Sequence, residues 1–148
     1  MADIILVEDD EDDIYFFKLA CNRLRNRPNL HIFRDGKALL DHLKQATLSH
    51  TIVMLDLNMP VAGGLDVLRE LNSLELINKM VVLVYTTSTN QKDVTLSYQL
   101  GAKTYITKAD SVADLQQMLD DVIRYWSELA TLPVSPNGNL ECQKEGVE

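Results

Sequence analysis

Three carboxylates, one hydroxyl and one ammonium group stand at the ends of short apolar runs in this sequence. Glu8 and Asp9 follow the first run, Asp56 follows the third, Thr86 follows the fourth and Lys108 follows the fifth. Carboxylates brought together repel one another, which raises their pKa values or demands a cation. A hard ion such as Mg²⁺ relieves that repulsion, and it typically uses one or two carboxylates, several waters and a phosphate oxygen.

The chemistry that fits this set is phosphoryl transfer to a carboxylate. A carboxylate is a competent nucleophile that forms an aspartyl phosphate, and we predict that Asp56 plays this part, with Mg²⁺ held by Glu8 and Asp9. The metal offsets charge on the transferring group and holds it in line with the attacking oxygen. Lys108 supplies a positive charge for one phosphoryl oxygen, and Thr86 can hydrogen-bond another. The set is incomplete for a hydrolase triad.

These positions meet only if the chain alternates strands and helices. Five β-rich runs, at residues 4–7, 30–33, 52–55, 80–85 and 103–107, alternate with segments whose apolar residues recur at steps of three and four. Runs that are apolar on both faces suit parallel strands covered by helices on each side. We therefore predict an α/β fold with a doubly wound, five-stranded parallel sheet, the (βα)5 flavodoxin-like arrangement in strand order 2-1-3-4-5. Ligands bind beyond the carboxyl ends of such strands, so the five side chains would share one crevice.

Composition limits the remaining choices. The 148 residues fit one compact domain, and we predict this domain over residues 1–130 and a flexible C-terminal tail over residues 131–148, where the periodicity stops. The net charge of −8 argues against a partner made of nucleic acid. The apolar runs are too short to cross a membrane, and the first residues lack a secretion signal. The two cysteines are expected to be reduced thiols, so we predict a cytoplasmic protein.

Four motifs together carry a resemblance to a known family. The segments 7–10 (VEDD), 55–60 (LDLNMP) and 101–108 (GAKTYITK), with Thr86, resemble the receiver domain of two-component response regulators, and the resemblance covers roughly residues 4–126. It implies a single-domain response regulator of a phosphorelay, not an enzyme acting on other substrates. Asp56 would accept a phosphoryl group from a sensor histidine kinase or a histidine phosphotransfer protein, in a reaction that needs Mg²⁺. The signal would leave through changed protein–protein contacts.

The resemblance also implies roles for individual residues. Asp9, Asp56 and the backbone carbonyl of Asn58 would bind Mg²⁺, with Glu8 acting mainly through water. Thr86 and Tyr105 would move together on phosphorylation, the hydroxyl turning toward the phosphate and the ring turning inward. Such a pair is a bistable element biased by local electrostatics.

Three positions depart from the usual pattern of the family. Glu8 replaces the commoner aspartate, and Thr87 stands where many members have alanine, which would narrow access to the acyl phosphate. Ala109 replaces the proline that usually follows the lysine, so the conformation of the Lys108–Ala109 bond stays open. The segments 86–88, 97–98 and 125–126 resemble the small regulators that partner bacterial phytochrome kinases.

Simpler interpretations apply to some of these residues. Asp10 to Asp13 are expected only to cap and charge the start of a helix. On the last helix, the apolar arc is wider than a core-facing stripe needs, and Met118, Tyr125 and Leu129 lie at one edge of it. Either the fourth helix or the tail covers this edge, or it is a contact for a partner or a homodimer.

Two other functions compete with the phosphorylation switch. A haloacid-dehalogenase-type phosphatase also uses a strand-end aspartate and Mg²⁺, but it requires a second aspartate two places later, where this chain has Asn58. A flavodoxin-like FMN carrier shares the predicted fold, but three acids at the strand ends would repel the cofactor phosphate.

Overall fold

Strands and helices alternate along the whole part of the chain that the computed structural model describes, residues 2–45 and 51–132. The strands are β1 (Asp3–Val7), β2 (Asn29–Phe33), β3 (Thr51–Leu55), β4 (Val81–Thr86) and β5 (Thr104–Thr107). The helices are α1 (Glu11–Arg23), α2 (Gly36–Leu43), α3 (Gly64–Ser73), α4 (Gln91–Gln99) and α5 (Val112–Arg124). A 3-10 turn (Ile77–Lys79) precedes β4, and a π-helical turn (Tyr125–Leu129) continues α5.

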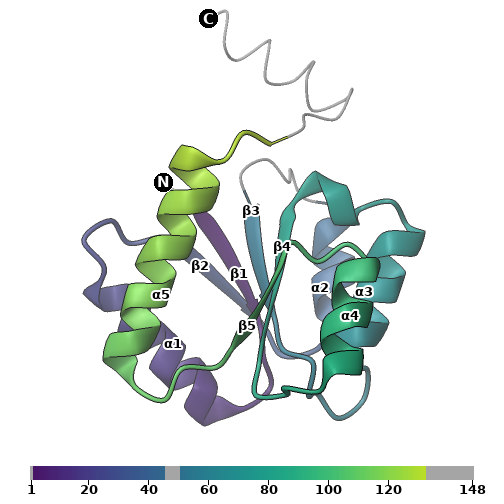
Figure 1. The fold of residues 1–148 in the computed structure, drawn as a ribbon, viewed down its shortest axis with the longest axis horizontal. Helices are drawn as coiled ribbons and strands as arrows, with labels where there is room; N and C mark the ends of the chain where they lie inside the picture. Colours follow the sequence, from purple (N-terminus) through teal and green to yellow (C-terminus); the bar gives the residue numbers. More distant parts are fainter. Residues whose placement is uncertain (1, 46–50, 133–148) are drawn as a thin grey trace, which may run out of the picture.

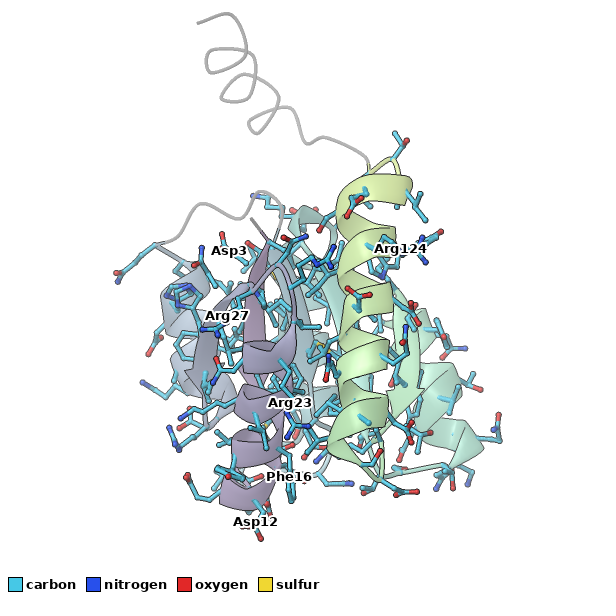
Figure 2. The ribbon with its side chains drawn as sticks, turned by 90° about the vertical axis from the view of Figure 1, so that its left-hand side faces the viewer. Asp3, Asp12, Phe16, Arg23, Arg27 and Arg124 are labelled. Carbon is cyan, nitrogen blue, oxygen red and sulfur yellow. The ribbon has the colours of Figure 1, made fainter. Side chains whose placement is uncertain are left out.

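The five strands form one parallel sheet in the order β2-β1-β3-β4-β5, so the predicted fold and strand order are confirmed. Val7 at the end of β1 pairs with Phe33 of β2 and with Leu55 of β3, which aligns the carboxyl ends of the three strands. Helices α1 and α5 cover one face of the sheet, and α2, α3 and α4 cover the other (Figure 1). Turned by 90°, the molecule shows α1 and α5 side by side (Figure 2).

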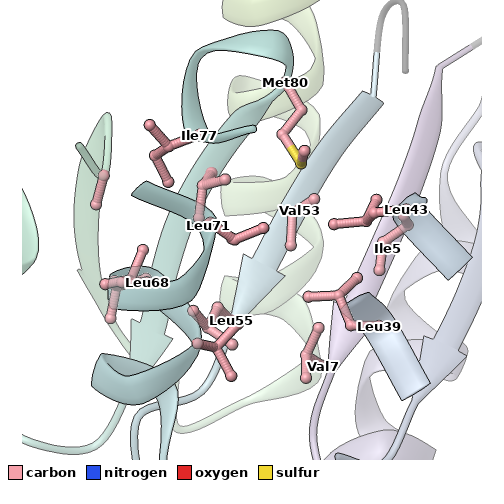
Figure 3. Packing of buried hydrophobic residues seen from close by; sticks show 14 of the residues in the cluster. Ile5, Val7, Leu39, Leu43, Val53, Leu55, Leu68, Leu71, Ile77 and Met80 are labelled. Carbon is pink, nitrogen blue, oxygen red and sulfur yellow. The ribbon is translucent and has the colours of Figure 1, made fainter. Parts of the chain in front are cut away.

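The side-chain alternation of each central strand supplies both halves of the core. Ile5 and Val7 of β1 face α2 and α3, whereas Ile4 and Leu6 face α1 and α5. On the α2–α3 side, strand residues such as Val53 interleave with leucines of the two helices (Figure 3). This double burial is why the strand runs read as apolar on both faces.

The ends of the elements differ slightly from the sequence prediction. The β-rich run at 80–85 was expected to be a strand, but the strand pairing begins at Val81, because Met80 closes the preceding 3-10 turn and packs in the core. Thr86 is the last residue of β4 rather than the first residue after it, because it pairs with Thr107 of β5. Gly101 follows α4 with φ of 109°, a conformation that glycine adopts readily and other residues avoid.

At the end of the described residues, Leu132 still packs against the core between the sheet and helices α1 and α5. The predicted tail falls mostly on residues 133–148, which lie outside the described residues, so its flexibility stays a prediction. Within residues 2–45 and 51–132, no helix combines the length and the apolar character needed to span a bilayer.

Candidate functional site

The sheet delivers the predicted site residues to one edge. Backbone hydrogen bonds extend the strand pattern by one residue: Asp56 N–H donates to Val7 O at 3.1 Å, and Lys108 N–H donates to Thr86 O at 2.9 Å. Glu8 N–H likewise donates to Phe33 O at 3.0 Å. The residues just past β1, β3 and β5 are therefore fixed by the sheet, although they are not counted in the strands.

Three carboxylates meet at this edge. Glu8, Asp9 and Asp56 each offer an oxygen such that all three lie within 4.8 Å of one another. The side chains of Glu8 and Asp56 are only 2% and 4% exposed. The pKa of Glu8 is raised to about 7, because burial outweighs the opposing hydrogen bond from Lys108 and the charge of Asp56 adds to the effect of burial. Three hard oxygen donors, two of them buried and the one from Asp9 partly exposed, fit a divalent cation such as Mg²⁺ or Mn²⁺.

Lys108 supplies the positive charge of the site. Its Nζ lies 2.6 Å from Glu8 Oε1, 2.6 Å from Asp13 Oδ2 and 3.5 Å from Asp56 Oδ2, with the side chain 10% exposed. Burial by itself lowers the pKa of a lysine, but the hydrogen bonds to Asp13 and Glu8, with the charges of Asp56 and Glu8, outweigh it and raise the pKa of Lys108. The lysine therefore stays charged among the carboxylates.

Asp13 is a site residue that the sequence reasoning missed. Asp10 caps α1 as expected, since its Oδ1 accepts a hydrogen bond from Asp13 N–H at 3.0 Å. The expectation that Asp13 only caps or charges the helix start was wrong, because its carboxylate binds Lys108. One signal was present: Asp13 directly precedes Ile14, the first buried residue of α1, so its side chain borders the buried face.

The hydroxyl side of the site is linked by hydrogen bonds. Asn58 Nδ2 donates to Thr86 Oγ1 and to Thr87 Oγ1, each at 3.3 Å. Thr86 Oγ1 also accepts from Ser88 N–H at 3.4 Å, and the Tyr105 hydroxyl donates to Ser88 O at 2.8 Å. Ser88 thus joins Thr86 to Tyr105, a connection that the sequence motifs did not reveal.

The loop after Lys108 resolves an open question. The described residues contain no cis peptide bond, so the Lys108–Ala109 bond is trans. Because Ala109 replaces a proline, it retains an N–H, which donates to the Tyr85 hydroxyl at 3.3 Å.

The predicted contact edge of the last helix is partly open. Tyr125 and Leu129 are 50% and 61% exposed, whereas Met118 is half-buried and packs against the core between the sheet and helices α1 and α5. Helix α4 lies on the opposite face of the sheet from α5 (Figure 1), so it does not cover this edge of the last helix, as one of the two alternatives had expected.

Comparisons with known proteins agree with this geometry. The response regulator receiver domain family matches residues 4–120. Response regulator Rcp1 of Synechocystis sp. (strain PCC 6803) is 33% identical over 137 residues, which cover 89% of this chain and 93% of Rcp1. The Mn²⁺-bound form of Rcp1 superposes with a TM-score of 0.73 at 33% identity, covering 90% of this chain and 100% of that one.

A second solved structure is similarly close. The phosphorylated cyanobacterial phytochrome response regulator RcpA is 32% identical, with a TM-score of 0.77, and the match covers 89% of this chain and 98% of that chain. The family match decides against the phosphatase and the FMN carrier. This chain therefore belongs to the response regulator receiver domain family, and it is a phosphoaccepting signalling domain of a two-component system rather than a conventional enzyme.

Proposed function

We propose that Asp56 is the residue that accepts the phosphoryl group, in a reaction that depends on Mg²⁺. The observation that carries this proposal is the place of its buried carboxylate, at the end of the central strand β3, among the oxygens of Glu8 and Asp9. These three carboxylates would hold the ion, with the backbone carbonyl of Asn58 as a further ligand. When bound, Mg²⁺ would offset the charge of the phosphoryl group and orient it.

The protein groups then have distinct tasks in the transfer. An Asp56 oxygen attacks phosphorus, a P–O bond forms, and the P–N bond to the donor histidine breaks, with the electron pair leaving on the imidazole. Lys108, already charged and buried, offers its ammonium to a phosphoryl oxygen. Thr86 Oγ1 is the acceptor in its contacts with Asn58 and Ser88, so its proton can be donated to another phosphoryl oxygen.

The same hydroxyl connects phosphorylation to the surface. If Thr86 turns toward a phosphoryl oxygen, its bond with Ser88 N–H is exchanged, and Ser88 O is the acceptor of the Tyr105 hydroxyl. Tyr105 lies on β5, and its N–H donates to the Tyr98 hydroxyl of α4 at 3.1 Å. We propose that the Thr86–Ser88–Tyr105 connection carries the change to the α4–β5 surface, where it alters protein contacts.

We further propose a bacterial phytochrome kinase, or a histidine phosphotransfer protein serving it, as the cytoplasmic phosphoryl donor. The similarity to RcpA, a phytochrome response regulator, supports this choice. A homodimer through α5 and its π-helical continuation is proposed from the exposed Tyr125 and Leu129, with Met118 at the same edge of the apolar arc. Light scattering at high protein concentration, with and without a phosphoryl donor, tests the homodimer, and a monomer in both conditions removes it.

The phosphoacceptor proposal is tested by intact-protein mass after incubation with acetyl phosphate or phosphoramidate. The expected result is one phosphoryl adduct on wild type that requires Mg²⁺, is lost in EDTA and is absent from Asp56→Asn. The fraction of protein that carries the adduct, followed over time after the donor is removed, also measures how fast the domain catalyses its own dephosphorylation. Folded wild type that gains no adduct in Mg²⁺ would show instead that the domain acts by binding alone.

A further inference from the structure

The ammonium of Lys108 lies closer to two other carboxylates than to the proposed phosphoacceptor. Its Nζ is 2.6 Å from both Asp13 and Glu8, but 3.5 Å from Asp56. An ammonium has three N–H donors: two make the shorter contacts, and the third faces Asp56 Oδ2 at 3.5 Å. Lys108 therefore has to loosen one of its shorter contacts before its ammonium can move closer to a phosphoryl group on Asp56.

The backbone on both sides of this contact is held in place. The Lys108 N–H is bonded to Thr86 O, and the next N–H is bonded to the Tyr85 hydroxyl. In α1, the side chain of Asp10 caps the first turn by accepting a hydrogen bond from Asp13 N–H, which fixes the backbone position of Asp13. A change of partner therefore requires movement of the Lys108 and Asp13 side chains and no movement of the backbone.

Of the two close partners, Asp13 is the one that can release the lysine. Its side chain is 39% exposed, so water can replace the ammonium, whereas the Glu8 side chain is 2% exposed and would keep only the hydrogen bond from Asp10 N–H. Burying an unpaired carboxylate costs far more than exposing one to water. Phosphorylation should therefore break the Lys108–Asp13 contact first.

We propose that Asp13 is a positioning residue that keeps the Lys108 ammonium nearer to itself than to Asp56 in the resting domain and competes with the phosphoryl group for it. This inference rests on the proposed phosphorylation of Asp56. In this arrangement Asp13 slows formation of the acyl phosphate, and the lysine is released to the phosphoryl group only as that group arrives.

The test measures the rate of phosphorylation by phosphoramidate in saturating Mg²⁺, followed by intact-protein mass. Asp13→Asn should react about fivefold faster, because it removes the charge that competes for the lysine ammonium. A hydrogen bond between charged groups is among the stronger ones, but the exposure of Asp13 to water weakens this one, so the acceleration is moderate. Asp13→Glu, which retains a carboxylate, should stay near the wild-type rate. Asp12→Asn is the matched control, because Asp12 is exposed on the same turn and points into solvent at the tip of α1 (Figure 2).

Two comparisons separate a positional effect from a change in overall charge. In a Lys108→Gln background, Asp13→Asn should no longer change the rate, since the lysine it acts through is gone. Acceleration of the same size in Asp12→Asn, or in the Lys108→Gln background, would overturn the inference. So would an Asp13→Asn rate equal to or below that of wild type.

The contact between Lys108 and Asp13 can also be measured without phosphorylation, so its failure can be distinguished from failure of the proposed function. In NMR spectra of lysine-labelled protein, Asp13→Asn should shift the side-chain resonance of Lys108, and Asp12→Asn should leave it in place. A wild type that takes no phosphoryl group would defeat the proposed function, and this spectrum would still decide the contact. An unshifted Lys108 resonance in Asp13→Asn would show that the contact does not exist in solution.

Discussion

Replacing the buried Glu8 by glutamine should remove a loss of folding stability that wild type shows as the pH rises. Glu8 is nearly inaccessible, accepts hydrogen bonds from Lys108 Nζ at 2.6 Å and Asp10 N–H at 3.2 Å, and lies beside Asp56. Burial is the largest influence on its carboxyl, and with the charge of Asp56 it outweighs Lys108, so the pKa is raised from 4.5 to about 7. Glutamine keeps the shape of the side chain and removes the titration.

The sign and size of the effect follow from linkage. Between pH 4.5 and about 7 the folded protein retains a proton on Glu8 that the unfolded chain has lost. Stability from this group is therefore fully present below the unfolded pKa and is lost as the pH rises through the folded pKa. The pKa difference corresponds to roughly 3 kcal/mol at most. In metal-free solution at alkaline pH, Glu8→Gln should be more stable than wild type by up to this amount.

Urea unfolding followed by circular dichroism, in EDTA from about pH 5 to about pH 8.5, measures the difference. The free energy of unfolding of wild type should fall relative to that of Glu8→Gln across this range. Saturating Mg²⁺ should remove the fall, because the ion stabilises the ionised carboxylates. Parallel curves for the two proteins in EDTA would refute the reasoning that burial controls this carboxyl.

Three further substitutions, with Leu74→Ala as an exposed control, test the local structure around the site, each by urea unfolding. Leu68 lies on the buried face of α3, and Leu68→Ala should lower the free energy of unfolding by ~2–5 kcal/mol. Leu74→Ala, at an exposed position, should lower it by less than ~0.5 kcal/mol, and equal losses would contradict the assigned burial. Gly64→Ala should cost ~1–3 kcal/mol and slow phosphorylation, because its Cβ would overlap the carbonyl oxygen of Asp56; an unaffected variant would show that this approach is not tight. Ser111→Ala should cost ~1 kcal/mol, since Ser111 Oγ caps α5 by accepting from the third N–H of the helix at 3.1 Å, and no loss would mean that the cap is dispensable.

The sequence by itself determined the architecture and the main site residues. The strand runs and the helical stripes are local patterns, since side chains alternate along a strand and repeat every three to four residues along a helix. Ile14 and Phe17 are buried on α1 as their spacing predicts. Because parallel strands end at a common edge, the positions of Asp56 and Lys108 just after their strands were enough to predict that they meet.

The tertiary structure alone decided how the charges at that edge are shared. Asp13 and Lys108 are 95 positions apart, and the place of Asp13 beside the buried Ile14 marks it as bordering the core without naming its partner. The link from Thr86 to Tyr105 through Ser88 likewise depends on backbone atoms, whose hydrogen bonds carry no residue-type signal. Periodicity reports which face of an element is buried, but the partner of each buried charge depends on distances between elements that only the packed fold fixes.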